Sequence, residues 1–313
     1  MLRKVFLVLV VSLLLPCVAS GGTKPFEKVG TYAAPFLKIG VSARAAGMGS
    51  AFTAVSNDAT AIYWNPAGIV EQQRTQVTLN TVVWPADIDI YFVGAIFTTP
   101  YLPGTFGLSA RALTMDPQIE RTIYMPEGTN RVFDAGDMSF GLTYAMWFTD
   151  RFSAGVTLHF IHMGLADKSV ETLAGDFGLL YRIGIRGMKL GMMIQSLGSE
   201  VDFDDRPSKM PTLFKVGLGF DAYRRGAHAL LAAGEFSHPS DNKERMNVGF
   251  EYEFNRFFFL RSGYNIDYDA QGLAWGMGFR IDTSQTSDLG FDYAWEDLGF
   301  LGQAHRVSLN FSY

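Results

Sequence analysis

Polar and apolar residues alternate at every second position along most of this chain after about residue 75. The segment Arg245–Phe254 places Met, Val, Phe, Tyr and Phe on one face and Arg, Asn, Gly, Glu and Glu on the other. Lys215–Asp221, Asp288–Glu296 and the segment that ends at Tyr313 follow the same period. Successive side chains of a β-strand point to opposite faces, so this period predicts strands rather than helices. We therefore expect an all-β protein.

About fourteen such segments follow one another along the chain. Each is close to the roughly 9–11 residues that cross a bilayer as a tilted strand. The segments are centred near Leu79, Phe92, Leu108, Leu142, Leu158, Leu179, Met192, Val216, Leu231, Phe250, Leu260, Met277, Phe291 and Leu309. The one around Leu231 is the least regular, because alanines blur its alternation.

The composition contains too little charge for an ordinary soluble domain. Of 313 residues, 48% are hydrophobic, 14% are aromatic and only 18% are charged, whereas soluble domains carry roughly 25% charged residues. The one long apolar run, Val5–Cys17, is shorter than the roughly 20 residues of a membrane-spanning helix. The net charge of −5 argues against nucleic acid as a partner, because phosphate binding needs basic clusters.

The N-terminus predicts export from the cytoplasm. Arg3 and Lys4 precede the apolar run, and Val18–Ser20 supplies the small residues that signal peptidase prefers. The one cysteine, Cys17, would be lost with this segment, so the mature chain would form no disulfide. The expected division is a signal peptide at 1–20, an N-terminal extension and hatch at 21–72, and a transmembrane β-barrel at 73–313.

The lengths of the predicted links alternate, starting after the second strand. Short links are expected at 149–150, 184–187, 224–226, 255–256 and 282–286. Longer and more charged links are expected at 115–135, 164–174, 198–210, 238–244, 267–271 and 297–303. Outer-membrane barrels have short periplasmic turns, longer outer loops and both termini on the periplasmic side. A soluble sandwich gives no reason for this segregation, so we predict a barrel in the cell outer membrane.

The face opposite the aromatic residues is rich in glycine and other small residues. Alternation alone does not tell which face points inward, but this face has too few charges for a solvated exterior. We interpret it as a barrel lumen that leaves room for a packed segment. Residues 30–70 precede the strands and read as irregular or helical, so they are the natural plug. The glycines are also explained by barrel curvature alone.

Two motifs in this N-terminal stretch resemble a known family. Both Phe36–Phe52 and Asn57–Gly68 resemble the opening of PorV/PorQ-like outer-membrane proteins, and the second is also similar to the hatch of FadL-type long-chain fatty acid transporters. The resemblance implies a fourteen-stranded barrel with a small helical hatch in its lumen. The matching hatch positions are Arg44, Gly47, Gly49, Asn57, Asp58, Asn65, Pro66, Ala67 and Gly68.

The resemblance also implies a function. The family includes a type IX secretion component that binds the C-terminal signal domains of cargo proteins and passes them to a surface attachment complex. We expect a non-enzymatic barrel, surrounded by outer-membrane lipid, that binds exported cargo or secretion components. The alternative is a FadL-like passive transporter of long-chain fatty acids or other hydrophobic small molecules. An outer-membrane enzyme that acts on lipid is a third interpretation.

Charged residues on the predicted lumenal face form a separate group. They are Arg111, Arg182, Lys215, Arg261 and Arg280, with Glu251, Glu253, Asp288 and Asp292 as acidic counterparts. We expect ion pairs among them to brace the hatch, with a substrate path as the alternative.

We expect no catalytic residue, metal or other cofactor. His159 and His162 are predicted on opposite faces of one strand, so they cannot bind one metal together. The acidic loop of Glu200, Asp202, Asp204 and Asp205 is expected to be solvated rather than to bind calcium. The turn Asp267–Asp269 lacks the downstream glutamate of a calcium loop.

Overall fold

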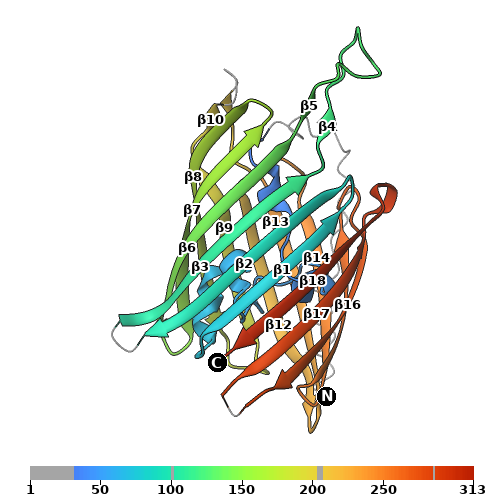
Figure 1. The fold of residues 1–313 in the computed structure, drawn as a ribbon. Helices are drawn as coiled ribbons and strands as arrows, with labels where there is room; N and C mark the ends of the chain where they lie inside the picture. The colour runs from blue at the N-terminus through green and yellow to red at the C-terminus, as the bar shows by residue number, and fades with distance from the viewer. Residues whose placement is uncertain (1–31, 100–101, 203–206, 285) are drawn as a thin grey trace.

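The structure, a computed structural model, describes residues 32–99, 102–202, 207–284 and 286–313. Fourteen antiparallel strands form a closed barrel (Figure 1), and β1 pairs with β18 to close it. The barrel strands are β1 (Gln76–Trp84), β2 (Ile88–Thr99), β3 (Leu102–Met115), β6 (Ala135–Thr149), β7 (Phe152–Leu165), β8 (Lys168–Arg182), β9 (Lys189–Gly198), β12 (Leu213–Arg225), β13 (His228–Pro239), β14 (Arg245–Phe254), β15 (Phe258–Ile266), β16 (Leu273–Asp282), β17 (Asp288–Asp297) and β18 (Gln303–Ser312). Every predicted strand centre lies inside one of them, which confirms the predicted all-β barrel.

The remaining elements are short. Two hairpins lie outside the barrel sheet: β4 (Gln118–Ile119) with β5 (Val132–Phe133), and β10 (Val201–Asp202) with β11 (Pro207–Ser208). The helical elements are η1 (Pro35–Lys38), α2 (Ala43–Gly47), α3 (Ala61–Trp64), η2 (Pro66–Glu71) and η3 (Gly299–Leu301). In the part of the chain that the structure describes, no helix has both the length and the apolar character that a membrane crossing needs.

The apolar face of the strands points outward and the small or polar face points into the lumen. Leu79, Leu142 and Leu309 are exposed on the outer surface. Their chain neighbours Thr78 and Ser308 are fully buried inside. The lipid-facing belt that the alternation predicts is therefore present, although no long apolar run occurs within the strands.

Two features of the link pattern differ from the prediction. The link expected at 164–174 is mostly strand, because Leu165 pairs with Lys168 and only residues 166–167 form the turn. β3, β6, β7 and β8 have 14 or 15 residues, so they extend beyond the expected strand length. In the extended part of β7 the buried residues are apolar, namely Ile161 and Met163, whereas the partly exposed His162 is polar. The alternation that revealed the strands, with apolar residues outside and small or polar residues inside, therefore does not continue there.

The N-terminal segment runs through the lumen from one end of the barrel to the other. Tyr32 forms a parallel bridge with Lys209, and its hydroxyl donates to the carbonyl oxygen of Ser240 (3.0 Å). Both partners lie in the long links, whereas the backbone N–H of Tyr313 donates to Thr75 (3.0 Å) at the short-turn end. The barrel strands thus begin and end at the short-turn end as predicted.

Tyr32 itself lies at the opposite, long-loop end. The side on which the N-terminus itself lies stays a prediction, because residues 1–31 are outside the described residues. The alternation locates the strands but contains no information on the direction of the segment inside them. The predicted signal peptide, with Cys17, lies outside the described residues, as do Asp204 and Asp205. The division of the chain at residues 20 and 72 stays a prediction.

Candidate functional site

Residues 33–72, here called the hatch, pack inside the barrel, and Arg44 is the centre of their contact with the wall. Arg44, on α2, donates from Nε to Glu251 Oε2 and from Nη2 to Glu251 Oε1, both at 2.9 Å. Its Nη1 donates to Asn57 Oδ1 (2.6 Å) and Asp58 Oδ2 (2.9 Å). Burial disfavours the charged form of Arg44, but Glu251 and Asp58 outweigh that effect and raise its pKa above the ordinary range. Arg44 thus links two other predicted hatch residues, Asn57 and Asp58, to Glu251, which is one of the predicted lumenal charges.

Glycines allow the hatch backbone to lie directly against the wall. An added Cβ at Gly263 of β15 would overlap the backbone nitrogen of Gly49, and one at Gly276 of β16 would lie 3.2 Å from the Cα of Gly47. Gly49 also has a φ of 59°, which favours glycine. Within the hatch, an added Cβ at Gly68 would overlap the carbonyl oxygen of Ser56. These contacts explain why the lumenal face is rich in glycine.

The Asn65–Gly68 motif joins the hatch to the opposite wall. Asn65 caps η2, because its Oδ1 accepts from the Ala67 backbone N–H at 3.1 Å. Its Nδ2 donates to the carbonyl oxygen of Leu179 on β8 (3.0 Å), and an added Cβ at Gly178 would lie 2.8 Å from Pro66. Pro66 is the first residue of this 3₁₀-helix. The carbonyl oxygen of Ala67 accepts from Ser153 Oγ on β7 (3.0 Å).

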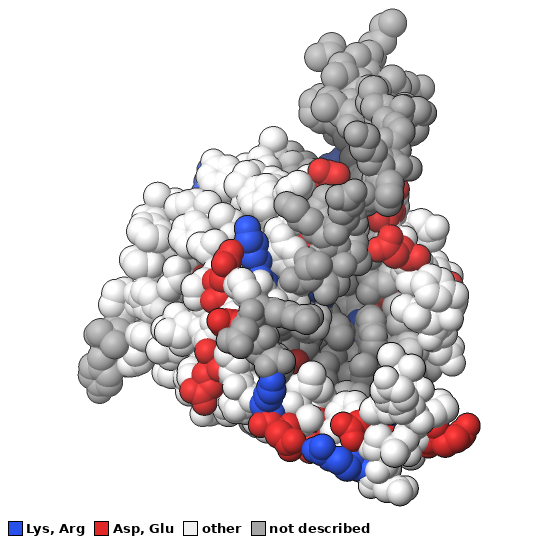
Figure 2. All heavy atoms as spheres, turned by 90° about the horizontal axis from the view of Figure 1, so that it is seen from above, with Lys and Arg blue, Asp and Glu red and all other residues white. Residues whose placement is uncertain are grey.

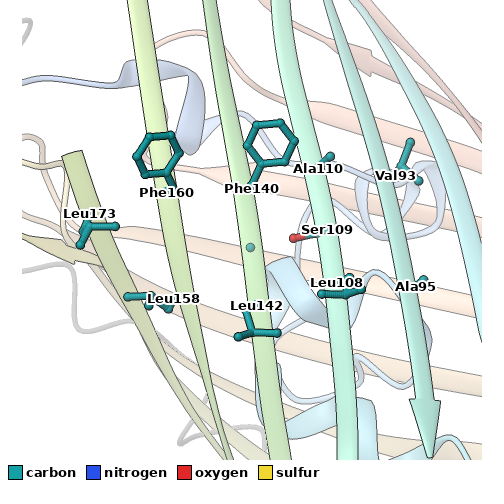
Figure 3. Close-up of a pocket in the computed structure, with 11 residues that line it drawn as sticks. Val93, Ala95, Leu108, Ser109, Ala110, Phe140, Leu142, Leu158, Phe160 and Leu173 are labelled. Carbon is teal, nitrogen blue, oxygen red and sulfur yellow. The ribbon is translucent and has the colours of Figure 1, made fainter. Parts of the chain in front are cut away.

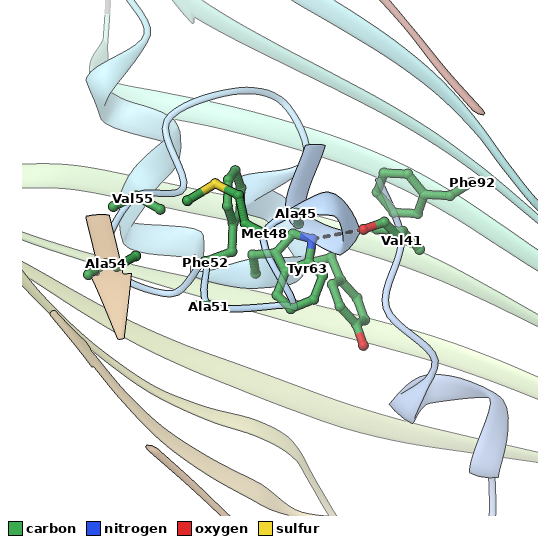
Figure 4. Packing of buried hydrophobic residues seen from close by; sticks show 11 residues of the cluster. Val41, Ala45, Met48, Ala51, Phe52, Ala54, Val55, Tyr63 and Phe92 are labelled. Atoms are coloured by element: carbon green, nitrogen blue, oxygen red, sulfur yellow. Dashed lines mark hydrogen bonds between the residues drawn. The ribbon is translucent and has the colours of Figure 1, made fainter. Parts of the chain in front are cut away.

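An apolar cluster holds the hatch itself together (Figure 4). Phe52 and Trp64 meet edge to face with ring centroids 5.9 Å apart, and Met48 and Val55 are buried beside them. The indole Nε1 of Trp64 donates to the carbonyl oxygen of Val41 (2.9 Å). This cluster gives the short helices a core that they could not form alone.

The predicted lumenal charges fall into three groups. In the first group, Arg261 donates to Glu251 (2.7 Å) and to Asp292 (2.6 Å), which extends the Arg44 contact along the wall. In the second, Arg182 pairs with Glu71 of the hatch (2.9 Å), and Arg280 lies 3.9 Å from Asp288 near the short turns.

The third group consists of two buried cations without a carboxylate partner among the described residues. Arg111 lies 5.3 Å from the ring centroid of Tyr63 and donates to the carbonyl oxygen of Leu37 (3.4 Å). The Lys215 ammonium lies 4.8 Å from the ring centroid of Trp64. These two residues contact the hatch through aromatic rings and carbonyl oxygens instead of ion pairs.

Sequence reasoning missed two wall glutamates, one that binds the hatch directly and one that pairs with an arginine in contact with the hatch. Glu235 of β13 accepts from the backbone N–H groups of Phe52 (3.1 Å) and Thr53 (2.9 Å). Glu296 of β17 pairs with Arg306 (2.6 Å), whose Nε donates to the carbonyl oxygen of Gly40 (3.2 Å). Both glutamates occupy small-residue faces of their strands, and a charge at such a position is the signal that could have identified them.

A small polar cavity lies between the hatch and the wall formed by β2 to β9. Within it His159 Nε2 lies 2.9 Å from Asp176 Oδ2, and Arg111 and Gln195 each have one buried polar atom without a partner. His162 instead contacts Glu171 (3.5 Å). Among the residues that the structure describes, no group of three histidine, cysteine or carboxylate side chains could hold a metal ion.

One apolar depression faces outward rather than into the lumen (Figure 3). It measures about 640 Å³, and outward-facing side chains such as Leu108, Phe140 and Phe160 line it. Ser109 is shared between this groove and the inner polar cavity, so only the thickness of the sheet separates them. The hydrogen-bonded pairing of β3 with β6 is continuous there.

The long-loop end has a projecting hairpin, drawn in green at the top of Figure 1. It comprises residues 116–134, with β4 and β5 at its base. At its tip Ile123 is 96% exposed and Tyr124 is 93% exposed. Large apolar side chains this exposed, outside the lipid-facing belt, are typical of a surface that binds a partner.

Comparisons with known proteins agree with this architecture. Residues 23–227 match the family model described as type IX secretion system protein PorV. A comparison with curated protein sequences finds no match. Among solved structures, the Pseudomonas putida toluene transporter TodX is similar with a TM-score of 0.61 and 11% identity, over 86% of this chain and 96% of that one.

Two further solved structures have the same fold. The Ralstonia pickettii toluene transporter TbuX has a TM-score of 0.60 and 12% identity, over 88% of this chain and 97% of that one. A Pseudomonas aeruginosa FadL homologue has a TM-score of 0.53 and 10% identity, over 88% and 97%. At these identities the likeness concerns the fold alone.

Proposed function

Because this chain belongs to the PorV family of type IX secretion system proteins, we propose that it binds exported cargo or secretion components at the long-loop end of the barrel, without catalysing a reaction. The family and the fold place it in the cell outer membrane. In such barrels the longer loops face the outside of the cell. The hairpin of residues 116–134 therefore presents its tip where an exported protein emerges.

The exposed tip of this hairpin is the observation that carries the proposal. Ile123 and Tyr124 offer apolar and aromatic surface that has no partner elsewhere in the described chain. Aromatic side chains are enriched in the centres of protein interfaces, where a few residues supply most of the binding energy. The hatch supports the proposal as well, because it contacts β14 and β8 and so lies in the lumen where a transport path would run.

The test replaces the apolar tip and measures export. In a strain that lacks the native copy, the double substitution Ile123→Ser/Tyr124→Ser should reduce the extracellular amount of a type IX cargo at least tenfold. Arg121→Ser, an exposed polar position on the same hairpin, is the matched control and should leave export intact. Normal export by the double variant, present at wild-type level in the membrane, would contradict the proposal.

The second candidate is passive transport of hydrophobic molecules, as in the toluene transporters that share the fold. The barrel-and-hatch architecture favours this candidate, whereas the polar lining of the inner cavity does not, because hydrophobic ligands bind in mostly apolar pockets. Uptake of a long-chain fatty acid and of toluene by deletion and complemented strains separates the two functions. Loss of uptake together with normal cargo export would favour the transporter.

A further inference from the structure

The short-turn end of the barrel presents exposed arginines that cargo binding at the other end does not use. Arg151, Arg186, Arg225 and Arg256 lie in or beside the turns that follow β6, β8, β12 and β14, and all four are exposed. We call these four residues the arginine belt. Arg224 pairs with Asp221 (3.0 Å), whereas no member of the belt forms an ion pair with a described carboxylate.

Aromatic side chains surround the barrel at the level of the belt. Phe148, Tyr181, Tyr223, Phe254 and Phe257 are exposed near the short turns. Aromatic rings on an outer-membrane barrel mark the level of the lipid headgroups. The belt therefore lies next to the headgroup region of the leaflet that faces the short turns, which is the periplasmic leaflet.

The charge at the other end of the barrel has the opposite sign. Seen from the long-loop end, most of the charged side chains around the opening are acidic (Figure 2). The acidic residues there include the exposed Asp167, Glu200 and Glu244. Phosphate-bearing lipids are thus attracted to one end of the molecule and repelled from the other.

We propose that the arginine belt binds the phosphate groups of anionic phospholipids in the periplasm-facing leaflet. A guanidinium donates two parallel hydrogen bonds to phosphate oxygens, which lysine does not do. The belt has four such groups on turns spread along the rim, and none of them forms an ion pair with a carboxylate in the described part of the chain. A diacyl lipid matches this site better than free phosphate does, because its acyl chains pack on the adjacent aromatic rings.

The experiment measures lipid preference with the full chain in detergent micelles. Two fluorescent lipids with identical acyl chains serve as probes, phosphatidylglycerol and phosphatidylcholine. Wild-type protein should bind phosphatidylglycerol at least fivefold more tightly, and the preference should shrink as salt is added, since the arginines are exposed. The variant with all four belt arginines changed to glutamine should lose the preference.

Two controls keep the result decisive. Replacing Lys209 and Lys243 with glutamine removes cations from the long-loop end, and this variant should keep the preference. Heat-modifiable migration on a gel verifies that every variant is folded. An unchanged preference in the folded belt variant would overturn the proposal. Displacement of phosphatidylglycerol by equimolar inorganic phosphate would also overturn it, because the belt would then be a free-anion site.

Discussion

Arg44 of the hatch and Glu251 of the barrel wall form a two-point ion pair, with Nε–Oε2 and Nη2–Oε1 distances of 2.9 Å. Arg261 and Asp292 continue this contact, so one buried network joins α2 to β14, β15 and β17. The geometry is specific to arginine, because a lysine could not make both bonds. The network fixes the hatch in position and in rotation.

The first prediction concerns this network. Arg44→Met should weaken the seating of the hatch by about 3–5 kcal/mol, because it leaves the buried Glu251 with one fewer cation. Adding Glu251→Gln should recover part of the loss. The measurement is the denaturant concentration at which a protease begins to cleave residues 33–72. The control Arg131→Met breaks an exposed pair with Asp167. It should change the free energy that holds the hatch in place by less than about 1 kcal/mol.

The second prediction concerns close backbone contact. Gly263→Ala should displace the hatch at a cost of about 1–3 kcal/mol, because the new methyl group overlaps Gly49. Gly234→Ala is the control, since its methyl group would meet only the carbonyl oxygen of Asn247 at 4.0 Å. Ion conductance across planar bilayers is the readout. Equal conductance of the two variants would mean that the hatch does not seal the lumen.

The third prediction concerns Glu235, which accepts two backbone N–H groups of the hatch. Glu235→Gln should destabilise the hatch by roughly 1–2 kcal/mol, because a neutral amide oxygen accepts weaker hydrogen bonds than a carboxylate does. Hydrogen exchange at Phe52 and Thr53 should quicken accordingly. Glu253→Gln changes a partly exposed residue on the neighbouring strand and should leave both amides protected.

The fourth prediction tests the lipid-facing belt. Val307→Arg places a charge near the middle of β18 and should lower the free energy of unfolding from vesicles by about 2–4 kcal/mol. Tyr313→Arg lies at the end of the same outward face and should cost only about 0–1 kcal/mol. Similar losses for the two variants would show that these positions are not at different membrane depths.

Alternation with a period of two was enough to locate the barrel strands, because lipid on one side and a filled lumen on the other impose different residues on the two faces. The turn at Ala166 was missed because β7 and β8 continue past the apolar belt, to where Ile161, Met163 and Val170 pack inward on the hatch and the usual pattern of the two faces is lost. Arg44 was identified by its motif, yet its partner Glu251 was one of several acidic candidates. Strand tilt and hatch rotation decide which cation pairs with which anion. The residue pattern of a single sequence does not encode either of them.

Arg111 illustrates the limit of reasoning by charge alone. Its position on the lumenal face was predicted, and an acidic partner was the natural expectation. The structure instead places its guanidinium 5.4 Å from the ring centroid of Phe36 and 5.3 Å from that of Tyr63. Carbonyl oxygens and aromatic faces compete with carboxylates for a buried cation, and their positions follow only from the folded hatch.

The chain passes through the lumen from Tyr32 at one rim to Thr75 at the other, and this path bears on how the barrel can fold. Gln76 and Ser312, which join the first strand to the last, are 236 positions apart in the chain. Once that seam is sealed, the segment inside can no longer enter from the side. We therefore expect the strands to curl and close around a hatch that is already in place.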